Sequence, residues 1–269
     1  MATDLSTSLE IMDKLAKVER DRGVRIIYAA VVGSRAYGLE GPNSDCDVKF
    51  IYVHPLERYL EIEHEQEYID AGEDVNGYDL RKFLQMVKKC GFNTAEIVNS
   101  PIVLIGSALQ AKLQNLVSKF MNQRKVVASY IGCMHRSKKC FENAVEANDG
   151  RQKTKHALSA IRLYLSGLYA AEHCTFPPVD FNALVKSLTD DGILSGKFCH
   201  LPALVDAKHH SEECAASDVS IAEAMNYADA LQERIDGFPA PVKNSYAEAL
   251  LDSFFKEQIG LTNPEQYLV

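Results

Sequence analysis

The residues from 24 to 32, VRIIYAAVV, form a near-continuous apolar run that is rich in β-branched side chains. A run of this length and composition is typical of a strand that is buried on both faces of a sheet. Gly33-Ser34 follows at once, and a turn-rich connection leads to a second strand pattern over residues 45–53. We therefore expect a sheet whose first two strands are joined by Gly33-Ser34 and the turn-rich connection over residues 35–44.

The rest of the first 121 residues mixes helical and extended patterns. Apolar side chains at helical spacing predict helices over about 6–22, 55–61 and 81–90. Extended patterns predict two further short strands over 75–80 and 102–105. These segments are consistent with a small α/β unit built on a mixed sheet.

Beyond the last predicted strand nearly every segment has helical periodicity. The predicted helices cover residues 108–121, 124–148, 152–173, 180–189, 217–235 and 244–258. We therefore predict an α+β protein with a mixed-sheet domain over residues 1–121 and a helical domain over residues 122–269.

Composition limits where such a protein acts. No segment approaches the roughly 20 apolar residues that a membrane-spanning helix needs, and the N-terminus lacks the pattern of a signal peptide. The seven cysteines are odd in number and include no CxxC pair, which argues against a disulfide framework or a zinc site. We expect a cytoplasmic protein with no membrane association.

Charge is distributed unevenly along the chain. The whole chain has 29 Lys and Arg residues against 37 Asp and Glu residues, a net charge of −8, which excludes a uniformly basic nucleic-acid coat. Residues 124–162 nevertheless hold nine basic residues and three acidic ones. Two interpretations stay open: a solvated helix face, or a patch that faces phosphates or nucleic acid.

Three aspartates carry the chemistry of the first 121 residues. Asp45 and Asp47 stand two apart on a predicted strand, so both side chains leave the same face. Two carboxylates there repel each other unless a cation lies between them, and Mg²⁺ prefers such oxygen ligands. Asp79 interrupts the next strand pattern and would complete the group if the two strands are neighbours. Three carboxylates on adjacent strands can hold two metal ions for phosphoryl or nucleotidyl transfer.

The Gly33-Ser34 pair stands where the first buried strand ends. Glycine lets the backbone approach a ligand closely, and serine adds a hydroxyl group and a backbone N–H at a predicted helix start. We expect the phosphates of a nucleotide to bind there while their oxygens reach the metal ions.

These residues resemble a known family. GSRAYGLEGPNSDCDVKFIYV is similar to the GSRAYG…SDxDxxxxYV signature of the DNA polymerase beta-like nucleotidyltransferase superfamily. The branch it resembles is that of the RlaP/YcgL-like, RNA repair pathway nucleotidyltransferases, which also has DLRKF-like and E-x-x-x-SP segments, here at residues 79–83 and 96–101. A helix with Lys155 and Arg162 completes the resemblance, which covers about residues 27–185.

The resemblance implies a role for each matched residue. Gly33 and Ser34 would contact the triphosphate, while the three aspartates would bind two Mg²⁺ (or Mn²⁺) ions and help to activate the acceptor. Arg35 would reach a phosphate, or else pair with an acid. Lys155 and Arg162 lie two helical turns apart on one face and would clamp the triphosphate or the acceptor, or else form an exposed helix face.

The implied reaction moves a nucleoside monophosphate from an NTP to an acceptor hydroxyl and releases pyrophosphate. The resemblance suggests RNA, a tRNA or a broken RNA end, as the acceptor. The basic stretch over residues 124–162 is compatible with that, and its Arg136, Lys138 and Lys139 are the expected RNA contacts. Protein AMPylation and nucleotidylation of a small molecule remain alternatives, as does a non-catalytic protein that senses nucleotides or binds a partner. Glu96 is expected in a surface or capping role, with the orientation of a backbone or a base as the alternative, and Tyr37 either stacks on a base or packs the turn.

Overall fold

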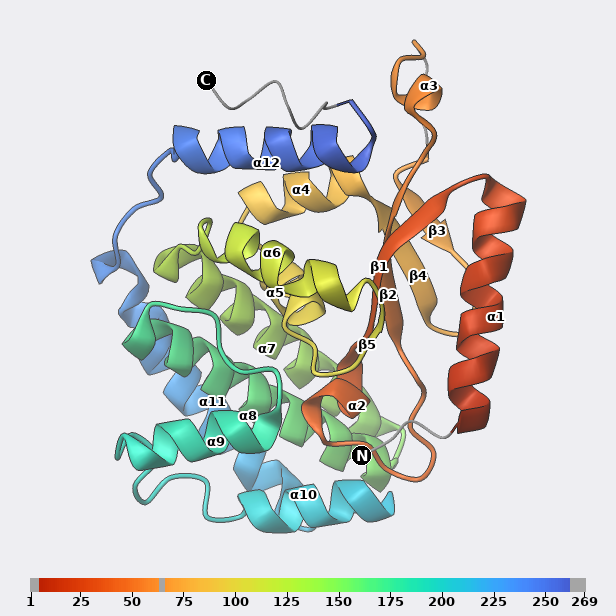
Figure 1. The fold of residues 1–269 in the computed structure, drawn as a ribbon. Helices are drawn as coiled ribbons and strands as arrows, with labels where there is room; N and C mark the ends of the chain where they lie inside the picture. The colour runs from red at the N-terminus through yellow and green to blue at the C-terminus, as the bar shows by residue number, and fades with distance from the viewer. Residues whose placement is uncertain (1–4, 63–65, 262–269) are drawn as a thin grey trace.

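The computed structural model describes residues 5–62 and 66–261, and its centre is a five-stranded mixed sheet (Figure 1). The strands are β1 (Arg25–Val31), β2 (Val48–Val53), β3 (Tyr68–Asp70), β4 (Val75–Asp79) and β5 (Val103–Ile105), in the order β3-β4-β2-β1-β5. β1 pairs antiparallel with β2 and β5, whereas β2 and β4 are parallel. The predicted α+β fold is confirmed.

Helices cover both faces of this sheet, which explains the apolar run of β1. On one face lies α1 (Leu5–Arg22), whose Leu15 is almost fully buried against the strands. On the other lie α4 (Leu80–Lys88), α5 (Phe92–Val98) and α6 (Ser107–Ser118), as Figure 1 shows. The two short elements α5 and β3, which have seven and three residues, are not among those expected from the sequence.

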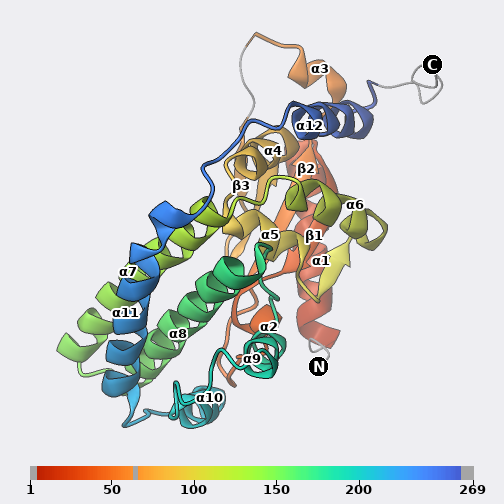
Figure 2. The same cartoon turned by 90° about the vertical axis from the view of Figure 1, so that its left-hand side faces the viewer.

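The second half of the fold is helical. Its core is an antiparallel pair, α7 (Gln123–Glu146) and α8 (Gly150–His173), with α11 (Ser217–Glu233) packed on α8 (Figure 2). Smaller helices surround this pair: α9 (Phe181–Asp190), α10 (Leu201–His210) and the 3-10 turn η1 (Ile235–Gly237). α10 is not among the helices expected from the sequence. Pro202 stands in its first turn, where proline is tolerated.

The C-terminal helix returns to the sheet. α12 (Ser245–Gln258) is predicted correctly as a helix, but it packs against α4 and α6 (Figures 1 and 2). Its Leu251 and Phe254 belong to the apolar core that these helices form with the sheet. The expected division after residue 121 therefore does not describe this helix. Periodicity reveals that a helix has an apolar face without revealing which surface covers that face. The predicted outer bounds, residues 1–4 and 262–269, lie outside the described residues.

Two expectations from composition can be compared with the structure. None of the seven cysteines, all of which lie within the described residues, is paired in a disulfide. No helix between residues 5 and 261, residues 63–65 aside, is long and apolar enough to cross a membrane.

Candidate active site

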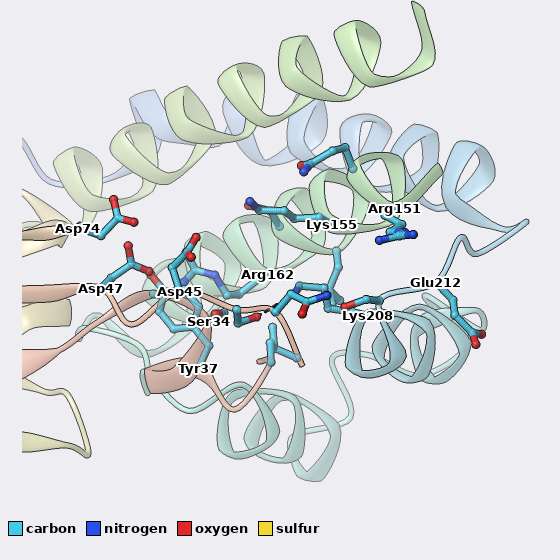
Figure 3. A pocket seen from close by; sticks show the side chains of 18 residues that line it. Ser34, Tyr37, Asp45, Asp47, Asp74, Arg151, Lys155, Arg162, Lys208 and Glu212 are labelled. Carbon is cyan, nitrogen blue, oxygen red and sulfur yellow. Dashed lines mark hydrogen bonds between the residues drawn. The ribbon is translucent and has the colours of Figure 1, made fainter. Parts of the chain in front are cut away.

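A cleft of about 600 Å³ opens where the sheet meets the helical half. One wall comes from α2 (Gly33–Tyr37), from the loop that leads to β2 and from Asp74. The opposite wall comes from α8 and the end of α10 (Figure 3). The motif residues of the first 121 positions thus face basic side chains of the helical half.

Three aspartates gather at one end of this cleft (Figure 3). Asp45 and Asp47 precede β2, which begins at Val48 and not at residue 45 as expected. The backbone carbonyl of Asp47 accepts a hydrogen bond from the N–H of Val32 at 2.8 Å, which ties this loop to the end of β1. The third aspartate is Asp74, the residue before β4.

Parallel pairing of β2 and β4 explains why Asp74 lies there. Val48 stands opposite Val75 in this pair, so the residues before them, Asp47 and Asp74, are neighbours. The N–H of Val48 also donates to the carbonyl of Asp74 at 3.0 Å. The sequence offers no signal for Asp74, because this residue stands in a turn and not in an apolar strand pattern.

The expectation that Asp79 faces Asp45 and Asp47 is wrong. Asp79 is the last residue of β4, five residues beyond Asp74, which places it about 16 Å along the strand at a rise of about 3.3 Å per residue. Its backbone position is opposite Tyr52, near the far end of β2. The direction of strand pairing, which the sequence pattern does not reveal, decides which end of β4 meets the other carboxylates.

Asp79 instead organises the far edge of the sheet. Its side chain caps α4 by accepting a hydrogen bond from the N–H of Arg81 at 2.8 Å, and it also accepts one from the hydroxyl of Tyr59. The Arg81 guanidinium lies over the rings of Tyr59 and Phe255, 5.1 and 5.3 Å from their centroids. Burial raises the pKa of Asp79, and its hydrogen bonds with Tyr59 and Arg81 oppose that rise. Asp79 therefore holds α4 and Tyr59 in place and does not line the cleft.

Gly33 is required by the geometry of the carboxylates. Its backbone has a positive φ of 70°, and a Cβ atom at this position would overlap the carboxylate of Asp47. Only glycine lets the chain pass this close to Asp47 without strain. Ser34 follows on the same wall of the cleft, beside the aspartates (Figure 3).

Within the part of the chain that the structure describes, Arg35 neither lines the cleft, where it could reach a phosphate, nor pairs with an acid, as the two expectations had it. Its guanidinium donates to the backbone carbonyls of Asp45 at 3.2 Å and Ser44 at 3.0 Å. The cleft lining does not include Arg35. It therefore holds the loop that carries Asp45, while its charge is directed to carbonyl groups and not to an acid.

Basic side chains form the opposite wall. Lys155 and Arg151 of α8 are exposed to the cleft, and Lys208 of α10 lies half-buried beside them (Figure 3). Burial and the nearby charge of Lys155 lower the pKa of Lys208. The Lys208 ammonium group donates to the hydroxyl of Ser44 at 3.4 Å. The sequence points to Arg151 only as part of the basic stretch, and it offers no signal for Lys208 because α10 was not predicted.

The electrostatics of the aspartates favour an added cation. Burial raises the pKa of Asp47, and the charges of Asp74 and Asp45 raise it further, against the opposing effect of Lys49 and Lys155. Clustered carboxylate oxygens are the donors that Mg²⁺ prefers, so these residues fit such an ion. Within the described residues, no group of three or more His, Cys, Asp or Glu side chains is arranged so that it could hold a metal ion on its own, and this includes the three aspartates. Phosphate oxygens or water would have to supply further ligands.

Arg162 is buried in a cluster that joins the two halves. Its guanidinium donates to the Glu96 carboxylate at 2.9 Å and lies 3.8 Å from the centroid of the Tyr37 ring. The Tyr37 hydroxyl donates to the other oxygen of Glu96, also at 2.9 Å. Glu96, with 12% of its side chain exposed, is therefore neither a surface residue nor a helix cap as expected. Both residues predicted as a clamp line the cleft, but the Arg162 guanidinium is paired with Glu96, whereas the Lys155 side chain is exposed.

The remaining predicted basic residues lie outside the cleft. Arg136, Lys138 and Lys139 are exposed on α7, where Lys138 pairs with Glu142 at 3.8 Å. Ser137, between them, exchanges a hydrogen bond with Ser159 of the cleft wall at 3.2 Å. This basic segment thus borders the cleft without lining it.

Comparison with known proteins adds to this geometry. Residues 8–257 match the family described as "RlaP: RNA repair pathway DNA polymerase beta family". The chain is also 32% identical over 208 residues to "Uncharacterized protein YcgL" of Bacillus subtilis (strain 168), covering 76% of this chain and 77% of that protein. The match to the family spans both the sheet and the helices that close the cleft.

Proposed function

We propose that this chain, which belongs to the RNA repair pathway DNA polymerase beta family, transfers a nucleoside monophosphate from an NTP to a hydroxyl group of an RNA acceptor. One observation carries the proposal: a single cleft holds three aspartates at one end and faces them with Lys155, Arg151 and Lys208. Catalysis of such transfer consists mainly of positioning and charge neutralisation, which this arrangement can supply.

The two walls of the cleft would have different roles, metal binding on one and phosphate binding on the other. Asp45, Asp47 and Asp74 would hold one or two Mg²⁺ (or Mn²⁺) ions, which when bound lower the pKa of an attacking hydroxyl and neutralise phosphate charge. The basic side chains would bind the phosphates that leave as pyrophosphate, since lysine and arginine attract phosphate oxygens. Gly33 and Ser34 would border the triphosphate beside the aspartates.

The choice of RNA as acceptor rests on two further points. The description of the family refers to RNA repair. The exposed basic segment of α7 borders the cleft, where an acceptor bound to the reacting nucleotide would emerge. Because the rest of the chain is acidic, we expect RNA to bind through this restricted surface and not over the whole molecule.

The test uses each NTP labelled at the α-phosphate, with Mg²⁺ or Mn²⁺, and adds deproteinised cell RNA to one reaction and cell protein to another. The control is the Asp45→Ala/Asp47→Ala variant. Label that enters RNA with the wild-type protein alone supports the proposal and identifies the base. Label that enters protein indicates AMPylation. NTP binding without transfer to either favours a small-molecule acceptor or a non-catalytic sensor, and it contradicts the proposal.

A further inference from the structure

We infer that Tyr37, Glu96 and Arg162 act together as positioning residues, which hold the Gly33–Ser34 turn against the aspartates and so set the rate of transfer. This inference rests on the proposed function and deepens it. The three residues come from α2, α5 and α8, three elements that the two halves of the fold contribute to the cleft or its support.

Each member of the Tyr37–Glu96–Arg162 cluster contacts the other two. Both Glu96 oxygens accept a hydrogen bond at 2.9 Å, one from Tyr37 and one from Arg162. The guanidinium of Arg162 also lies on the ring of Tyr37. Burial raises the pKa of the Tyr37 hydroxyl, so the group keeps its proton and remains a donor to Glu96. A closed set of directional contacts admits one arrangement of the three side chains.

The α2 helix needs such an anchor. It has five residues, and a helix of that length has no stability of its own in water. Gly33 and Ser34 form its first turn, and Tyr37 is its last residue. Between them, the side chain of Ala36 is buried. The place of Tyr37 therefore determines how Ser34 is presented to Asp47, which lies against Gly33.

A charged pair suits this task better than an apolar contact would. A buried ion pair adds little net stability compared with apolar residues of the same size, because both charges lose their hydration. Its hydrogen bonds, however, fix distance and direction. Arg162 and Glu96 have only 10% and 12% of their side chains exposed. Because Lys155 stands two turns from Arg162 on the same helix, the cluster also aligns the basic wall with the aspartates.

A double-mutant cycle between Tyr37→Phe and Ser34→Ala tests this inference. Tyr37→Phe keeps the ring on Arg162 and removes only the hydroxyl. We expect it to lower kcat about fivefold, the equivalent of one net hydrogen bond, with little change in the unfolding temperature. Since Tyr37 acts through Ser34, the same change in the Ser34→Ala background should alter kcat less than about twofold. Tyr246→Phe, at an exposed position on α12, is the matched control and should leave kcat unchanged.

Three results would overturn the inference: a Tyr37→Phe variant with wild-type kcat, effects of the two changes that simply multiply, or a loss of kcat that follows the loss of folded protein. Glu96→Gln, which keeps the side-chain shape, can replace Tyr37→Phe in the same double-mutant cycle with Ser34→Ala and provides a second test. Failure of the proposed function looks different, because the wild-type protein itself would transfer no label to RNA. In that case the affinity for Mg²⁺-ATP replaces kcat as the quantity measured for the wild-type protein and for each variant of the cycle. Unchanged affinity in every variant rejects the inference.

Discussion

Asp74 lies beside Asp47 at the start of the parallel pair β2–β4, although the two residues are far apart in the sequence. Asp79 lies at the other end of β4, where it caps α4. Asp74, just before β4, and Asp79, its last residue, thus have separate environments, one open to the cleft and one buried. Substitutions that remove charge without changing shape can separate their roles.

Asp74→Asn should abolish most of the nucleotidyl transfer. If Asp74 is one of three carboxylates that would hold a metal ion, its loss should cost several kcal/mol of transition-state stabilisation, which is about a hundredfold or more in kcat/KM. Asparagine tolerates the positive φ of this residue, 60°, so the fold should be unaffected. The matched control is Asp79→Asn, which keeps the cap and should retain activity within a factor of about three. If the two variants behaved in the opposite way, Asp79 would be the catalytic residue after all.

Asp79→Ala should instead reduce stability. The change removes the cap of α4 and leaves the Tyr59 hydroxyl without its acceptor. Together these losses should lower the free energy of unfolding by about 2–3 kcal/mol. Urea unfolding followed by circular dichroism measures this, with Asp79→Asn as the reference that retains an acceptor. Equal stability of the two variants would contradict a structural role for this side chain.

Gly33→Ala should inactivate the protein through local displacement of Asp47. The new Cβ atom meets the carboxylate, and the positive φ costs a further 1–2 kcal/mol, roughly. Gly192→Ala is the matched control, because Gly192 has a φ of 73° and open space around it. Because both residues have a positive φ, we expect Gly33→Ala and Gly192→Ala to lose similar amounts of stability. Only Gly33→Ala should lose nucleotidyl transfer. Activity measured at a temperature where both variants are folded decides this.

Lys155→Ala should weaken binding of the triphosphate. Removal of one cationic contact to a phosphate costs about 1–2 kcal/mol, or roughly tenfold in KM for the NTP. Lys153→Ala is the control on the same helix, since Lys153 pairs with Asp218 and Glu213 and is not part of the cleft wall. Steady-state kinetics with varied NTP gives both values. A Lys155→Ala variant with wild-type KM would remove this residue from the proposed site.

The sequence predicts this site in part, and the limits have physical causes. A buried strand followed by Gly33 and a pair of aspartates predicts the sheet and one wall of the cleft, because these patterns are local. Asp74 and Lys208 were missed because their places depend on strand direction and on the unpredicted α10. Glu96 was misjudged for a related reason: its partner Arg162 is distant in sequence, and only packing of the two halves brings the side chains together.

RNA binding should depend on the basic segment of α7. Arg136, Lys138 and Lys139 are exposed there beside the cleft, so their joint change to Gln should weaken RNA binding. If each contacts one phosphate of a single strand, the slope of log K against log salt should fall by about 2, at about 0.7 per contact. A second triple variant, Lys17→Gln/Lys186→Gln/Lys243→Gln, removes the same charge at exposed positions elsewhere and should keep the slope. Binding of a fluorescent RNA at several salt concentrations measures both, and equal slopes would show that these residues do not contact the acceptor.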